Sequence, residues 1–132
     1  MSGYWDCTLT VTGAERELAA LVERIHSGWS EGAIKPRTLE SLLPVPPMLH
    51  EDAAHDWKGL HWGTPTGDCR TCGPNRSPGL MSWYFDAGLP PEPAIAALAA
   101  LHPALRWDLY SVDGYLDDSR HQWTWEHGVL VK

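Results

Sequence analysis

Residues 42–86 contain Leu42-Leu43-Pro44-Val45-Pro46-Pro47, Asp56-Trp57, His61-Trp62-Gly63-Thr64 and Met81-Ser82-Trp83-Tyr84-Phe85-Asp86. This stretch is the part of the sequence that says most about the fold. Prolines interrupt residues 29–79 so often that one continuous helix is excluded. Each buried indole ring removes a large apolar area from water, so a few tryptophans can hold an irregular segment in place. We therefore predict a long ordered connection over residues 29–79, rich in Pro, Gly and Trp, with Trp57, Trp62 and Trp83 as anchors.

Regular elements are predicted on both sides of this stretch. Residues 4–12 alternate between apolar and polar side chains, which indicates a half-buried strand. Thr12 and Glu15 stand at capping-box spacing before the apolar stripe Leu18, Leu21, Val22 and Ile25, which predicts a helix ending near Gly28. Further strands are predicted at 81–86, 105–110 and 122–126, and a helix runs from the prolines at 90 and 91 to His102. His127-Gly128 is a turn before a short ending, Val129-Leu130-Val131.

The order of these elements predicts a single α+β domain over residues 1–132. The predicted order is strand, helix, long connection, strand, helix, strand and strand. This order suits a four-stranded, mainly antiparallel sheet with two helices on one face. A chain of 132 residues is long enough to bury a core without disulfides or a metal ion.

The same elements resemble the YubB-type family of ferredoxin-like domains, uncharacterised proteins carried on bacterial plasmids and phages. The resemblance rests on Leu9-Thr10-Val11-Thr12-Gly13, Leu43-Pro44-Val45-Pro46, Trp57 with His61-Trp62-Gly63-Thr64, the strand near Trp83, and the helix leading to His102-Pro103. It implies a ferredoxin-like sandwich and an origin in a mobile genetic element. It implies neither catalytic residues nor an iron–sulfur cluster. Family members tend to follow Trp-Gly-Thr with lysine and tryptophan, whereas this chain has Pro65, Thr66 and Gly67.

Composition excludes several classes of function. Seventeen acidic and ten basic side chains give a net charge of −7, and an acidic surface disfavours direct binding of nucleic acid. An acidic protein is better suited to a basic protein or protein complex as its partner. The chain shows no apolar stretch of membrane-spanning length and no signal peptide, so we expect a cytoplasmic protein without a membrane partner.

Cys69-Arg70-Thr71-Cys72-Gly73 has the spacing of half a zinc knuckle. Two more ligands are needed, and His61 or His50 are the candidates, while Cys7 falls on the apolar face of its strand. An ordinary loop with reduced thiols, or with a bridge formed by adventitious oxidation, is the favoured alternative, so we expect no cofactor and keep zinc as the exception. The histidines form no recognisable catalytic pattern, and we predict no catalytic residue and no enzymatic activity.

Acidic side chains are the candidate partner-binding residues. Asp113, Asp117 and Asp118, together with Glu15 and Glu23, could mimic a row of phosphates, and Asp52 and Asp56 add to the negative charge. The main hypothesis is a non-enzymatic mobile-element protein that binds a partner macromolecule, for example an inhibitor of a host CRISPR-type complex. The alternative is a small zinc module or enzyme that uses Cys69, Cys72 and histidines of the connection. Binding of nucleic acid by the sheet face is a third hypothesis, which the acidic charge opposes.

Overall fold

The computed structural model describes residues 5–27, 39, 42–43, 45–64, 67–113 and 119–132, and for residues 25–27 and 67–73 it describes the backbone alone. The elements in chain order are β1 (Trp5–Thr12), α1 (Glu15–Ser27), α3 (Glu51–His61), β2 (Gly67–Ser77), β3 (Leu80–Ala87), α4 (Glu92–Leu101), β4 (Arg106–Asp113), β5 (Arg120–Glu126) and β6 (Val129–Leu130).

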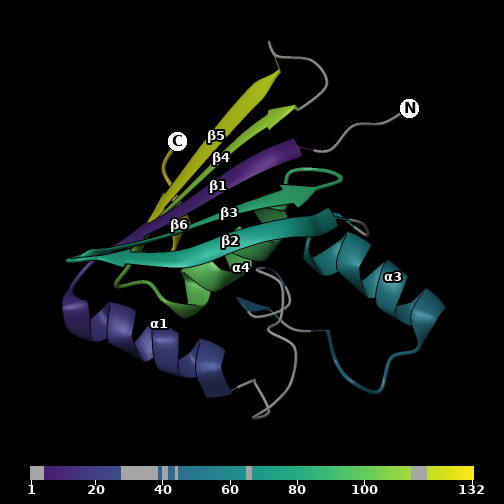
Figure 1. Cartoon of the computed structure of the whole chain (residues 1–132), viewed down its shortest axis with the longest axis horizontal. Coiled ribbons are helices and arrows are strands. Elements are labelled where there is room, and N and C mark those ends of the chain that lie inside the picture. The colour runs from purple at the N-terminus through teal and green to yellow at the C-terminus, as the bar shows by residue number, and fades with distance from the viewer. Residues whose placement is uncertain (1–4, 28–38, 40–41, 44, 65–66, 114–118) are drawn as a thin grey trace.

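The strands form one antiparallel sheet in the order β2-β3-β1-β4-β5-β6. Figure 1 shows α1 and α4 beneath one face of this sheet, and α3 on the same side, beyond α4. The opposite face carries no helix among the described residues. The helix-covered face will be called the inner face and the opposite one the outer face.

The core lies between the inner face and the helices. Alternation places Cys7, Leu9 and Val11 of β1 inward, and all three are buried. The stripe of α1 contributes Leu18 and Leu21, and α4 contributes its small and aliphatic side chains. Indole rings supply much of the remaining volume: the core also contains Trp62, Trp83, Trp107 and Trp125.

Two local features fix the ends of the elements. The β2–β3 turn has Gly79 at φ +74°, and its carbonyl accepts a hydrogen bond from the Gly13 N–H at 3.2 Å. The turn is thereby attached to the end of β1. At the other hairpin, β5 and β6 are joined by the two residues His127 (φ 55°) and Gly128 (φ 80°), which have the positive φ values of a type I′ turn.

The prediction of a four-stranded ferredoxin-like sandwich with two helices is wrong. Among the described residues the protein is α+β with three helices and a six-stranded antiparallel sheet. Nor is the stretch 29–79 one long connection, because it contains α3 and β2. The six elements predicted on either side of it are present, and the short ending forms β6.

Physical reasons for the two missed elements are visible in the sequence. The prolines that suggested a loop stop at Pro47 and resume at Pro65, so α3 fits between them, with Glu51 and Asp52 at the end that favours negative charge. The β2 sequence has no apolar alternation. It is a strand because its turn folds it back onto β3, and Pro74 is tolerated because β2 is an edge strand.

Candidate functional site

The junction between α3 and the core contains the Trp62-Gly63-Thr64 segment. The ring of Trp62 is buried, and its indole N–H donates a hydrogen bond to the Leu43 carbonyl at 2.8 Å. Gly63 has φ +87°, and a Cβ at this position would lie 2.5 Å from a side-chain carbon of Pro93. The buried Thr64 hydroxyl accepts a hydrogen bond from the Leu89 N–H at 3.2 Å. Each residue of this motif therefore has a structural explanation.

Trp57 lies at the same junction and is only partly buried. Its ring stacks on His61 with 4.5 Å between ring centroids and meets the edge of Trp62 at 6.2 Å. The Lys58 ammonium lies 5.3 Å from the centroid of the Trp62 ring, within cation–π range. The last turn of α3 is thus held by aromatic contacts, and its one lysine lies against the junction.

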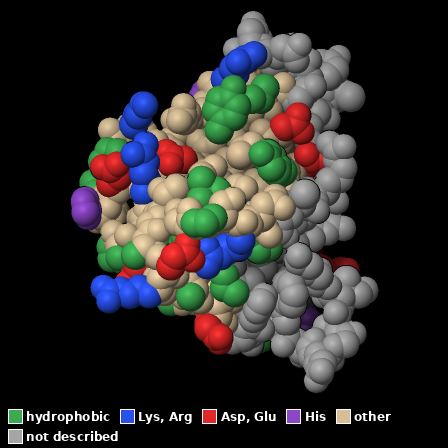
Figure 2. Space-filling model, turned by 60° about the vertical axis from the view of Figure 1, so that its left-hand side comes forward, with side chains coloured by type: hydrophobic (Ala, Val, Ile, Leu, Met, Phe, Trp, Pro, Cys, Tyr) green, Lys and Arg blue, Asp and Glu red, His purple; other side chains and the backbone are tan. Residues whose placement is uncertain are grey.

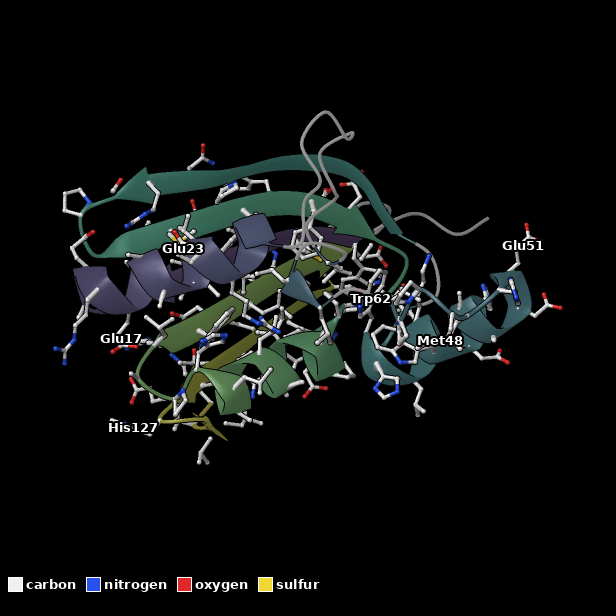
Figure 3. The ribbon with its side chains drawn as sticks, turned by 90° about the horizontal axis from the view of Figure 1, so that it is seen from below. Glu17, Glu23, Met48, Glu51, Trp62 and His127 are labelled. Carbon is white, nitrogen blue, oxygen red and sulfur yellow. The ribbon has the colours of Figure 1, made fainter. Side chains whose placement is uncertain are left out.

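The rest of α3 faces solvent. None of its residues is buried. Figure 3 shows the helix projecting to the side of α4, with Trp62 at its inner end and Glu51 at its far end. Glu51, Asp52 and Asp56 are exposed, as are the large apolar side chains of Met48 (71% exposed) and Leu60 (75%). We call this exposed set, Met48, Glu51, Asp52, Asp56 and Leu60, the α3 surface.

The other predicted acidic residues do not join the α3 surface. Glu15 begins α1, where its carboxylate accepts hydrogen bonds from the Gly79 N–H and from the Arg76 guanidinium. The hydrogen bond from Gly79 is the main reason that the pKa of Glu15 is lowered, and the charge of Arg76 adds to it. Thr12 is not the start of the helix, so the expected capping box is replaced by this contact with the β2–β3 turn.

Glu23 is exposed on α1, the helix that also carries Glu17 in its first turn (Figure 3). Asp113 pairs with Trp5 at the start of β1, whereas Glu15 follows the end of β1, so the two acids lie toward opposite ends of that strand. Asp117 and Asp118 lie outside the described residues. On the face shown in Figure 2, acidic and basic side chains are interleaved. The described acids thus form separate groups instead of one row.

The candidate zinc ligands are only partly described. Cys69 and Cys72 are residues of β2, in which Cys72 pairs with Tyr84. Only their backbone is described, and their side chains lie outside the described part of the chain. His61 is exposed on α3 and stacked on Trp57. Cys7 is 2% exposed, as its place on the apolar face predicts, and its sulfur accepts a hydrogen bond from the Ser111 hydroxyl at 3.3 Å. Within the described segments, no three His, Cys, Asp or Glu side chains are placed to hold a metal ion.

A half-buried histidine and a buried tryptophan pack together on the helix-covered side of the protein. His102 ends α4, and its ring centroid lies 6.1 Å from that of Trp107. The His102 Nε2 and Trp107 Nε1 atoms are both buried without a hydrogen-bond partner among the described residues. Burial lowers the pKa of His102, the positive charge of Arg24 lowers it further, and Glu17 opposes the shift.

A depression of about 350 Å³ lies at the end of the sheet, between the ends of β1 and β5 and the loop before β4. Its charged side chains are Arg106 and Glu126, which form an ion pair at 3.1 Å. Arg106 also pairs with Asp108 at 3.2 Å. Because the guanidinium is flanked by two carboxylates, the depression offers little attraction to an anion.

Two exposed tyrosines on the outer face were not among the predicted site residues. Thr8 in the middle of β1 pairs with Tyr84 of β3 on one side and with Tyr110 of β4 on the other. Tyr84 is 52% exposed and Tyr110 is 37% exposed. The signal was present in the sequence, because each tyrosine alternates with core residues of its strand and must therefore face away from them.

No protein-family model, curated protein or solved structure matches this chain. The resemblance to the YubB-type family therefore stays a prediction. In the segments that the structure describes, no helix has the length and apolar character needed to cross a membrane.

Proposed function

We propose that the protein is a non-enzymatic, acidic binding protein whose α3 surface docks onto a basic region of a partner protein or complex. The observation that carries this proposal is the exposure of α3, an 11-residue helix with no buried residue. An isolated helix of this length is marginally stable in water, because forming its first turn is costly. Here aromatic contacts around Trp57 and Trp62 hold it in place, so the protein maintains a solvent-exposed helix.

The chemistry of the α3 surface favours a basic partner. Three carboxylates are exposed on it, while Lys58 lies against the Trp62 ring at the junction. Met48 and Leu60 add apolar area that a partner can remove from water. Carboxylates at the rim of an interface mainly accelerate association and set its salt dependence, whereas apolar side chains add affinity at the centre.

A complex that handles nucleic acid is the partner class that we favour, with CRISPR effectors of a bacterial host as the specific candidates. Channels that bind phosphate backbones are basic, and a rigid helix that carries carboxylates can occupy such a channel. The origin in a mobile genetic element is part of the same proposal, because such elements encounter host defence complexes.

Purified CRISPR effector complexes with their guide RNA provide the test. The immobilised protein should bind at least one of them, and the association rate should fall steeply as the salt concentration rises. Asp52→Asn together with Asp56→Asn should weaken binding by about tenfold, which corresponds to about 1.4 kcal/mol. The matched control is Glu17→Gln with Glu92→Gln, which removes the same charge from α1 and α4 and should change affinity by about twofold at most.

Two results would overturn the proposal. One is the absence of binding to every complex in the panel at low salt, measured with protein whose unfolding transition is normal. The other is an equal loss of affinity in both double variants, because this would show an effect of net charge and not of the α3 surface.

A further inference from the structure

The outer face of the sheet is a second surface, independent of α3, and most of its described side chains are exposed or half-buried, with Asp86 and Thr124 buried. Cross-strand pairing orders its side chains in rows, of which the central one is Tyr84, Thr8, Tyr110 and Gln122. The next row toward the start of β1 contains Asp86, Asp6, Val112 and Arg120. On the other side lie Ser82, Thr10, Asp108 and Thr124.

The central row contains a slot between two aromatic rings. Tyr84 and Tyr110 are separated by two strand spacings, about 10 Å in total, and side chains stand roughly perpendicular to a sheet. The small side chain of Thr8 lies between them on the same face. The two rings can therefore approach an inserted side chain from both sides, with Thr8 beneath it. We refer to Tyr84, Thr8 and Tyr110 as the tyrosine slot.

Charges around the tyrosine slot are mainly negative. Asp6 is exposed two residues before Thr8 on the same strand face. Asp86 and Asp108 occupy the equivalent positions beside the two tyrosines, but Asp86 is buried and Asp108 is half-buried beside Arg106. Counted with Glu126, the described outer face has four carboxylates against the two guanidinium groups of Arg106 and Arg120. Both guanidinium groups have partners within the face: Arg106 pairs with Asp108 and Glu126, and Arg120 contacts the Tyr110 hydroxyl.

The composition of this face is typical of protein interfaces. Tyrosine and arginine are enriched in such interfaces and lysine is depleted, and the described outer face has two of each of the former and no lysine. Arg120 also orients one side of the slot, because its guanidinium donates a hydrogen bond to the Tyr110 hydroxyl at 3.4 Å. A tyrosine that is held in this way loses less side-chain entropy when a partner binds.

We propose that the tyrosine slot receives an arginine side chain of a protein partner. A guanidinium group is flat, stacks on aromatic rings and is attracted by their negative faces. Neighbouring carboxylates then supply hydrogen-bond acceptors and charge complementarity, with Asp6 the most accessible of them. Stacking of nucleotide bases on the same rings is the competing occupant, but the excess of carboxylates repels the phosphates that come with them.

Two-dimensional NMR titration tests this assignment with three probes: a blocked peptide of alternating arginine and glycine, the lysine version of that peptide, and oligothymidine. The arginine peptide should shift the amide signals of Thr8, Tyr84 and Tyr110. It should bind several-fold more tightly than the lysine peptide, because lysine does not stack as a plane. Tyr84→Leu and Tyr110→Leu should each weaken binding about threefold or more, while leucine keeps a strand-compatible apolar side chain.

The variant Glu17→Gln/Glu92→Gln, which removes two charges from α1 and α4, serves as the control and should leave peptide affinity within about twofold. The two proposals can fail separately, because Tyr84→Leu and Tyr110→Leu test the slot, whereas Asp52→Asn/Asp56→Asn tests the α3 surface. Shifts confined to α3, equal affinity for both peptides, or no shifts at low salt would refute the arginine assignment. Tighter binding of oligothymidine than of the arginine peptide would assign the slot to nucleotide bases instead.

Discussion

The indole N–H of Trp62 and the carbonyl oxygen of Leu43 are 2.8 Å apart, and this hydrogen bond joins the end of α3 to a segment 19 residues earlier in the chain. Trp62→Phe keeps an aromatic ring but removes the donor and leaves the partly buried carbonyl without it. We expect the free energy of unfolding to fall by about 1–3 kcal/mol, measured by urea denaturation. Trp57→Phe is the control, and its smaller cost should reflect the partial exposure of Trp57. Equal costs would contradict a special role for the Trp62 hydrogen bond.

Two glycines near α3 should respond to alanine in opposite directions. Gly63→Ala forces a Cβ into a residue with φ +87° and to within 2.5 Å of the Pro93 ring. It should destabilise the protein by about 1–3 kcal/mol. Gly59 lies inside α3, and a Cβ there would point into open space, so Gly59→Ala should stabilise by about 0.5–1 kcal/mol. Thermal unfolding of both variants checks the prediction, which fails if their midpoints move in the same direction.

Stability should depend on pH through His102. Its pKa is lowered in the folded state because burial disfavours the imidazolium and Arg24 repels it. The unfolded chain therefore binds this proton more readily, and the free energy of unfolding should fall as pH drops from neutrality through about 6.5. His102→Leu should reduce the difference between urea midpoints at pH 7.5 and about pH 5.5. An unchanged difference would show that other groups cause it.

Glu15 adds a separate contribution at lower pH. Its lowered pKa means that the carboxylate stabilises the fold above its ordinary pKa of 4.5, and that this contribution is lost as pH falls through the folded value. Glu15→Gln should flatten the stability curve in that acid range alone. Its control is Glu23→Gln, on the same helix. A flattened curve in the control would contradict the assignment to the contacts of Glu15 with Gly79 and Arg76.

The β5–β6 turn should tolerate, and gain from, a change at His127. Histidine has φ 55° there, in a region that asparagine and glycine occupy more easily. His127→Asn should raise the free energy of unfolding by about 0.5–1 kcal/mol. Gly128→Ala should lower it, because Gly128 also has a positive φ and lies against Ala99 and Pro103. The denaturant midpoints of both variants test this prediction. Destabilisation by His127→Asn would show that the imidazole itself contributes to stability.

Elemental analysis of untagged protein discriminates the zinc alternative. A structural zinc site needs four ligands, and the sulfur of the buried Cys7 accepts a hydrogen bond from the Ser111 hydroxyl, on the apolar face of β1. We expect substoichiometric zinc, and we expect the unchanged protein to unfold at the same temperature with and without a chelator. One zinc ion per chain, lost in a Cys69→Ser/Cys72→Ser variant, would restore the metal-binding hypothesis.

Local patterns predicted most elements correctly. The alternation of Cys7, Leu9 and Val11 and the stripe of Leu18 and Leu21 identify buried faces because a strand and a helix each repeat with a fixed period. The same logic identified α4, β3, β4 and β5 and placed Trp123 and Trp125 on one face. The sequence patterns did not predict β2, because its apolar residues do not alternate, or α3, because its few turns are flanked by prolines. For the candidate acidic residues, the sequence identified the side chains but did not predict which of them lie close together in the fold.

The sequence by itself therefore determined the α+β class, the acidic charge and the direction in which each patterned side chain points, since these depend on composition and on backbone periodicity. Tertiary structure alone decided that six strands share one sheet, that Glu15 meets the β2–β3 turn, and that Tyr84 and Tyr110 flank Thr8. The physical reason is that strand pairing and side-chain contacts join residues tens of positions apart. The energy of such contacts depends on the whole packed arrangement and not on any local window of the chain.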